Sequence, residues 1–88
     1  TRDEKIAQNI MRLLFCKIYD EQNNKDILEF SNRLDEDLIK FNSRFSLLFD
    51  NVKKTYSEIF EKNEKIKNEG KNLSYVVAKL EKYSILDA

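Results

Sequence analysis

Apolar residues recur every three or four positions through most of the chain, which is the spacing of one face of an α-helix. The sequence contains no proline and a single glycine, so few residues in it interrupt helical structure. The pattern therefore predicts an all-α fold, a small bundle of three main helices at about 3–21, 35–56 and 72–84. Its 88 residues suffice for one domain with a thin core, since chains of this size bury only about 60–65% of their unfolded surface.

The first predicted helix is apolar on more than one side. One stripe consists of Ile6, Ile10, Leu14 and Ile18, with Met11, Phe15 and Tyr19 beside it. Leu13 and Cys16 fall on the opposite side, so this helix requires cover on two faces. It also ends on two acids, Asp20 and Glu21, at the negative end of the helix dipole. A basic group must neutralise them, either a lysine of this chain or a group on another surface.

The second predicted helix has the clearest signals. Asp35 is the expected N-cap, and Leu34 and Ile39 are spaced as a hydrophobic staple. Leu38, Phe41, Phe45, Leu48 and Val52 then form a core stripe, and the helix is expected to end near Tyr56. The preceding segment, residues 22–33, reads as a loop with room for a short extended piece.

Residues 61–72 contain one apolar side chain, Ile66, so we expect a polar, exposed and mobile linker before the last helix. Asn72 is the expected cap of that helix. Its core stripe is predicted to be Leu73, Val76, Val77, Leu80 and Tyr83. The aromatic residues are expected to be core residues rather than a platform on which nucleic-acid bases stack; these are Phe41, Phe45, Phe49, Tyr75 and Tyr83.

Composition excludes several kinds of chemistry. The chain has no histidine and one cysteine, which leaves no zinc cluster, no Cys-His nucleophile and no internal disulfide. One glycine is too few for a phosphate-binding loop or a dinucleotide fingerprint. The acidic run at residues 35–37 is read as helix capping rather than acid–base catalysis or metal binding. We therefore predict no catalytic, cofactor-binding or metal-binding residue within this chain.

Charge and hydropathy give weaker indications. Sixteen basic and sixteen acidic residues cancel, so no overall field attracts the chain to nucleic acid or to an anionic membrane. The second half is mildly basic, which makes Lys53 and Lys54 candidates for DNA contact, together with Lys62, Lys65, Lys67 and Lys71; a solvated face is the alternative explanation. No segment has the length of a membrane span or the pattern of a signal peptide, and we expect a cytoplasmic protein.

Three stretches of this sequence resemble a known family in order and spacing: EKIAQNIMRLLFCKIYDE, LFDNVKKTYSEIF and LSYVVAKLEKYSILDA. They are similar to the N-terminal helical segment of bacterial adenine-N6 DNA methyltransferases, specifically the modification (M) subunit of type I restriction-modification systems and close relatives. In that family a segment like YSILDA leads into the S-adenosylmethionine-binding domain. The catalytic Asn-Pro-Pro-Phe/Tyr motif cannot be present here because the chain lacks proline.

The resemblance implies that this chain is a non-catalytic fragment of a DNA-methylating enzyme. Its partners would be the downstream methyltransferase domain, the specificity subunit, and DNA held by the assembled enzyme, with S-adenosylmethionine as the cofactor of the parent enzyme. Combined with the helical wheel, it predicts a docking surface made of Leu13, Cys16, Asp20 and Glu21. Two alternatives stay open: a freestanding helical module that self-associates through residues 41–52, and a single-chain restriction and methylation enzyme.

Overall fold

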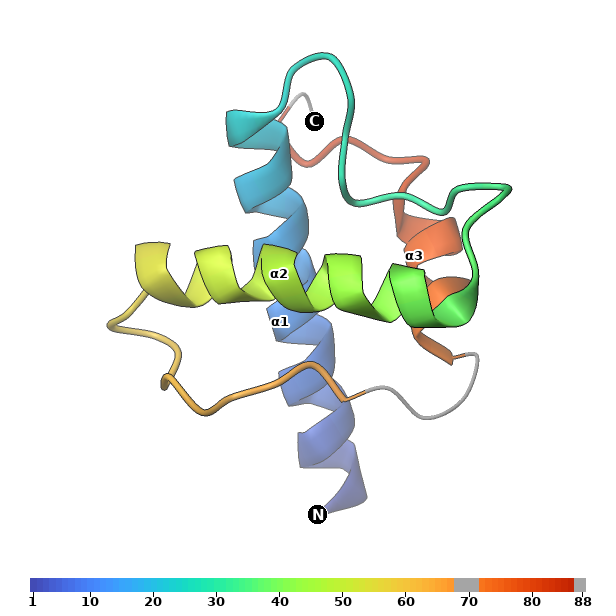
Figure 1. Ribbon diagram of the computed structural model, residues 1–88. Coiled ribbons are helices and arrows are strands. Elements are labelled where there is room, and N and C mark those ends of the chain that lie inside the picture. Colours follow the sequence, from blue (N-terminus) through green and yellow to red (C-terminus); the bar gives the residue numbers. More distant parts are fainter. Residues whose placement is uncertain (68–71, 87–88) are drawn as a thin grey trace.

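The computed structural model describes residues 1–67 and 72–86 and contains three helices. These are α1 (Arg2–Asn23), α2 (Leu38–Thr55) and α3 (Asn72–Leu80), and the described residues form no strand. In Figure 1, α2 crosses α1 and α3 lies to one side of both, while the N-terminal part of α1 extends below the other two helices. The predicted all-α class is confirmed.

Side-chain hydrogen bonds cap the N-termini of the first two helices. Thr1 and Glu4 form a reciprocal capping box at the start of α1, a pattern present in the sequence as T-x-x-E. Asp37, and not the predicted Asp35, is the N-cap of α2, and its carboxylate accepts a hydrogen bond of 2.8 Å from the Lys40 N–H. Because the cap lies two residues later than predicted, the proposed Leu34–Ile39 staple is wrong: both side chains are exposed.

The core is built around α2. The predicted stripe of this helix is confirmed except for Leu38, which is exposed, and Phe49 joins it. Edge-to-face contacts connect Phe45 to Phe30 and Phe49 to Phe60, with ring centroids 5.4 Å apart in each pair. Such pairs contribute about 0.5–1.5 kcal/mol beyond the burial of their area. Among the described residues, the buried apolar set is Leu13, Cys16, Phe30, Phe41, Phe45, Leu48, Phe49, Val52, Phe60, Leu73 and Val77.

The core position of residues 41–52 also bears on the proposed self-association. Phe41, Phe45, Leu48, Phe49 and Val52 are each at most 5% exposed within a single copy of the chain. This stripe is therefore used inside a single copy of the chain, and self-association through it would require the core to open.

The third helix is shorter than predicted. It ends at Leu80, and a turn follows in which the Tyr83 N–H donates to the Leu80 carbonyl. Leu73 and Val77 are buried as expected, but Tyr83 lies outside the core. Tyr75 is exposed as well, so the predicted core role of these two tyrosines is wrong. The predicted capping role of the Asn72 side chain lies outside the described residues.

Residues 61–67, predicted as a mobile linker, are fastened to the first two helices. The Asn9 side chain exchanges two hydrogen bonds with the backbone of Lys67, at 2.8 and 3.0 Å. Arg12 pairs with Glu64 at 3.0 Å, and Ile66 packs against the core. These contacts join positions more than 50 residues apart in the sequence, which local composition does not reveal. Residues 68–71 of the predicted linker lie outside the described part of the chain.

Candidate functional site

The buried face of α1 differs from the predicted one. Its members recur in adjacent pairs every four residues, and they are Arg12, Leu13, Cys16, Lys17, Asp20 and Glu21. Four of these six are charged, which is why a search for apolar stripes selects the wrong side of the helix. Leu13 is 2% exposed and Cys16 is fully buried, so both belong to the core of this chain.

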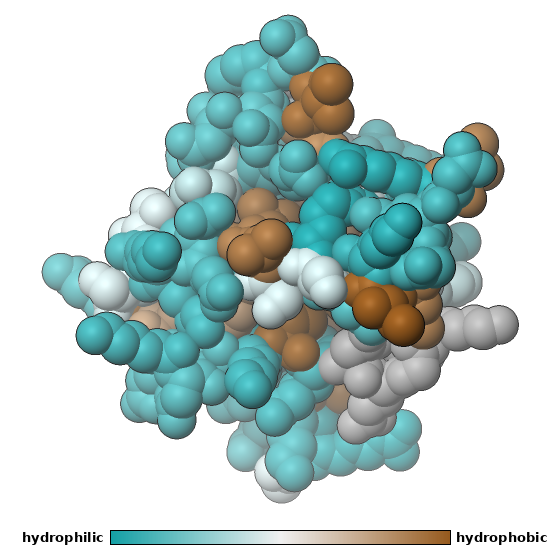
Figure 2. Space-filling view, viewed as in Figure 1, coloured by the Kyte–Doolittle hydropathy of each residue, from teal (hydrophilic) through white to brown (hydrophobic). Residues whose placement is uncertain are grey.

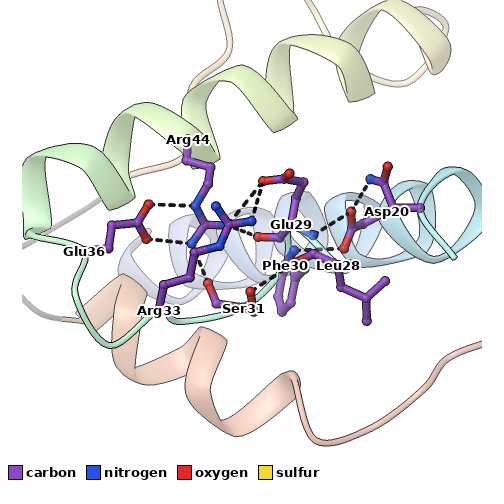
Figure 3. Close-up of polar contacts among 9 residues, drawn as sticks. Asp20, Leu28, Glu29, Phe30, Ser31, Arg33, Glu36 and Arg44 are labelled. Atoms are coloured by element: carbon purple, nitrogen blue, oxygen red, sulfur yellow. Dashed lines mark hydrogen bonds and ion pairs between the residues drawn. The ribbon is translucent and has the colours of Figure 1, made fainter. Parts of the chain in front are cut away.

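Asp20 connects the end of α1 to the loop that follows. Its fully buried carboxylate accepts hydrogen bonds from the Phe30 N–H at 2.8 Å, the Glu29 N–H at 3.0 Å and the Asn24 side-chain amide at 2.7 Å. Figure 3 shows this carboxylate directed at the backbone of residues 29 and 30. The predicted conflict with the helix dipole is resolved by amide donors, and the acid fixes the loop that carries Phe30 into the core.

Arg44 of α2 holds the same loop from the other side (Figure 3). Its guanidinium donates to the Glu36 carboxylate at 2.7 and 2.9 Å and to the backbone carbonyls of Glu29 and Ser31. The hydrogen bond from Arg44 is the main cause that holds the pKa of Glu36 below its usual range, and in turn Glu36 raises the pKa of Arg44. Asp20 and Arg44 together explain how residues 24–37 are ordered without secondary structure.

Glu21 performs a similar role for the C-terminal segment. Its carboxylate accepts hydrogen bonds from the Ser84 hydroxyl at 2.8 Å and from the backbone N–H groups of Ile85 and Leu86 at 2.9 and 3.0 Å. Lys17 lies 3.4 Å away on the same helix. Burial alone would raise the pKa of Glu21, but these donors and the Lys17 charge outweigh it and lower the pKa to about 2.

These contacts correct the predicted docking surface. Leu13, Cys16, Asp20 and Glu21 lie together as predicted, but they face the chain's own core, loop and C-terminal segment rather than an outside neighbour. Burial, followed by the nearby Asp20 charge, raises the pKa of the Cys16 thiol to about 12, so the thiol is neutral and unreactive at neutral pH.

The two lysines proposed for DNA contact have different environments. Lys53 is mostly buried: its ammonium donates to the carbonyls of Lys62 and Glu64, both at 2.9 Å, and lies 3.3 Å from Asp50. It holds residues 61–67 against α2 and is not free for a ligand. Lys54 is exposed, as are Lys62, Lys65 and Lys67, while Lys71 lies outside the described residues.

An uncovered apolar surface occurs instead on the other side of α1. Ile6 is 48% exposed, Ile10 45%, Met11 41% and Leu14 37%, and we call these four residues the α1 outer stripe. Residues 2–8 are exposed throughout, in the part of α1 that extends beyond the other helices (Figure 1). The face shown in Figure 2 is mostly hydrophilic, with apolar side chains at separate points. The sequence did reveal this stripe, but we predicted the opposite face, with Leu13 and Cys16, to be the one that meets a neighbour.

One hollow on the described surface lies beside the loop that Asp20 and Arg44 hold. A crevice of about 360 Å³ lies between α1 and α2, lined by Tyr19, Asn23, Asn24, Glu29, Arg44, Leu47, Leu48 and Asn51. Its ionised groups, Glu29 and Arg44, serve the loop contacts described above. Within residues 1–67 and 72–86, no three acidic, cysteine or histidine side chains come together as a metal site.

Comparison with protein-family models, curated protein sequences and solved structures finds no match for this chain. In the described part of the chain, every helix is too short or too polar to cross a membrane.

Proposed function

We propose that this chain is a helical accessory domain of an adenine-specific, S-adenosylmethionine-dependent DNA methyltransferase of a restriction-modification system, which docks on the rest of that enzyme through the α1 outer stripe. The resemblance of the three quoted sequence stretches to the helical segment of such enzymes supports the enzyme class. The docking role is supported by one structural observation, the four large apolar side chains that the chain leaves uncovered on α1.

The physical argument for docking rests on the burial that a partner would complete. Each member of the α1 outer stripe is a little under half exposed, so covering all four would contribute about 2–4 kcal/mol from apolar area. The stripe itself carries no charge, which favours a partner surface that is apolar. The acids Asp20 and Glu21 lie on the opposite, buried face of α1, are already satisfied within the chain and add nothing to the attraction.

In this proposal the chain supplies no catalytic residue. The methyltransferase domain would bind S-adenosylmethionine and the target adenine, and a specificity subunit or an equivalent region of the same chain would select the DNA sequence. A cytoplasmic location follows from that role. The accessory domain would hold the catalytic domain in the assembled enzyme, and its ordered C-terminal segment, fixed to α1 by Glu21, would set the direction in which the chain continues.

The test compares the solvent exposure of Met11, the chain's one methionine, in this chain alone and in the complete methyltransferase. Oxidation by hydrogen peroxide, followed by mass spectrometry, is expected to be fast in the isolated chain and at least about tenfold slower in the complete enzyme. Equal rates would contradict docking through this stripe.

A pair of variants separates docking from general surface effects. Ile10→Lys places a charge in the α1 outer stripe and is expected to restore Met11 oxidation in the complete enzyme and to weaken its assembly. Leu34→Lys is the control, because Leu34 is fully exposed and lies in the loop between α1 and α2 rather than on α1. Sedimentation of the isolated chain tests the rival function: a dimer abolished by Ile10→Lys would favour a self-associating module over the accessory role.

A further inference from the structure

The α1 outer stripe belongs to a regular pattern on the helix surface. Two neighbouring rows along α1, each with a spacing of four residues, are exposed: Ile6, Ile10 and Leu14 in one row, and Asp3, Ala7 and Met11 in the other. Rows of this spacing are the ridges that interlock with a second helix, and the small side chain of Ala7 lets a neighbour approach most closely there. From Ile6 to Leu14 the pattern spans about 12 Å, which is the width of one helix.

The N-terminal end of this pattern is acidic. Asp3 lies one turn before Ala7, and its exposed carboxylate has no hydrogen bond or ion pair within residues 1–67 and 72–86. The basic residues of the same turn, Arg2 and Lys5, lie outside the two rows, because residues one or two positions apart on a helix do not share a face. A neighbour that covers the stripe therefore meets a negative charge at this end.

Area and charge both argue against a second copy of the chain as the occupant. Four side chains, each under half exposed, provide a small fraction of the roughly 1,200 Å² that a stable interface between free proteins buries. Parallel copies of α1 would bring two Asp3 carboxylates together. Antiparallel copies centred on Ile10 would bring Asp3 to Lys17, which is buried and paired with Glu21. The stripe therefore suits a tethered neighbour, which binds at a high effective concentration.

We propose that the occupant of the α1 outer stripe is an amphipathic α-helix of the parent enzyme that carries a lysine or arginine at the end beside Asp3. This inference rests on the proposed function, which supplies the tethered neighbour. Apolar side chains three and four apart on that helix pack against the two rows. The helix runs antiparallel to α1, because its C-terminal end, which favours basic residues, then lies beside Asp3.

The first experiment reverses the charge at Asp3 and measures Met11 oxidation in the complete enzyme. Because oxidation proceeds from the undocked fraction, Asp3→Lys is expected to raise the rate about threefold to tenfold. Asp26→Lys is the matched control, since it makes the same substitution at an exposed aspartate in the loop after α1. It is expected to leave the rate unchanged. In the isolated chain, Asp3→Lys should alter neither the helix content nor the Met11 rate, which separates loss of docking from fraying of the first turn.

The second experiment identifies the occupant by photo-cross-linking. The thiol introduced by Asp3→Cys is labelled with a benzophenone maleimide, and Cys16 does not compete because it is fully buried. After irradiation of the complete enzyme, mass spectrometry is expected to find a linked peptide with apolar residues three and four apart and a lysine or arginine within one turn of the linked position. Lys5→Cys is the control on the other side of the helix and is expected to give little of this product.

Equal Met11 rates for Asp3→Lys and Asp26→Lys would overturn the proposal. So would a linked peptide without the expected pattern, the absence of a linked peptide, or a cross-link between two copies of this chain. These results leave the proposed function in place as long as Ile10→Lys still restores Met11 oxidation. Equal Met11 rates in the isolated chain and the unsubstituted complete enzyme would instead contradict the proposed function itself.

Discussion

Removal of the Asp20 carboxylate is the sharpest test of how the loop after α1 is held. Asp20→Ala would leave three donors without their acceptor: the N–H groups of Phe30 and Glu29 and the side-chain amide of Asn24. The Phe30 N–H is buried, and leaving it unsatisfied costs about 1–3 kcal/mol. The other two are partly buried and can reach water, at a smaller cost of roughly 0.5–1 kcal/mol each.

We therefore expect Asp20→Ala to lower the free energy of unfolding by about 2–5 kcal/mol. This is a large part of the total, because domains of this size are stable by only about 0.05–0.15 kcal/mol per residue. The measurement is urea unfolding followed by far-ultraviolet circular dichroism, with the m-value checked for two-state behaviour.

Asp26→Ala is the matched control, because Asp26 lies in the same loop and is exposed. It is expected to change the free energy of unfolding by less than about 0.5 kcal/mol. If Asp20→Ala proves as mild as Asp26→Ala, Asp20 does not anchor the loop in the way the contacts indicate.

Three further outcomes follow from the same contacts. Glu21→Gln is expected to speed amide exchange at Ile85 and Leu86 while leaving α2 unchanged; equal rates in the two proteins would show that the carboxylate does not hold the segment. Because the pKa of Glu21 falls from 4.5 to about 2 on folding, its contribution to the free energy of unfolding is present above pH 4.5 and is lost as pH falls toward 2. The stability of the Gln variant should therefore fall less steeply with pH over this range. Superimposable acid-unfolding curves would contradict the shift. Phe45→Ala is expected to cost about 3–5 kcal/mol in urea unfolding, and a cost below about 1 kcal/mol would argue against its central place in the core.

The sequence predicted the features that depend on local spacing. Apolar residues three and four apart predict the three helices and the core face of α2. The capping box at Thr1 was also predictable from its T-x-x-E pattern, but we did not predict it. The N-cap of α2 was predicted at the wrong residue because Asp35, Glu36 and Asp37 are chemically similar candidates. Of these, Glu36 instead accepts hydrogen bonds from Arg44.

The face of α1 could not be chosen from the sequence alone. Arg12, Lys17, Asp20 and Glu21 lie on the buried face, and their burial is possible only because distant groups satisfy them. Glu64 pairs with Arg12, and the backbone of residues 85 and 86 binds Glu21. Periodicity found two apolar stripes on this helix but carried no information about which side would find those partners.

The ordered conformation of the connecting segments could not be predicted from the sequence for the same reason. Residues 61–67 contain one apolar side chain, and composition correctly indicates that they cannot order themselves. Lys53, Arg12 and Asn9 order them from two helices, through contacts that depend on the tertiary arrangement. The exposure of Tyr75 is a related case, because an aromatic residue at helical spacing is indistinguishable from a core residue until the helix is placed.

The central claim, that α1 turns Cys16 inward and the outer stripe outward, is tested most directly by probing both faces in one sample. The native chain would be treated at pH 8 with iodoacetamide and, separately, with hydrogen peroxide, and the modified residues quantified by mass spectrometry. The account predicts ready oxidation of Met11, which is 41% exposed, in the native chain and no alkylation of Cys16 until the chain unfolds. Rapid alkylation of Cys16 together with protection of Met11 would show that the helix faces the other way.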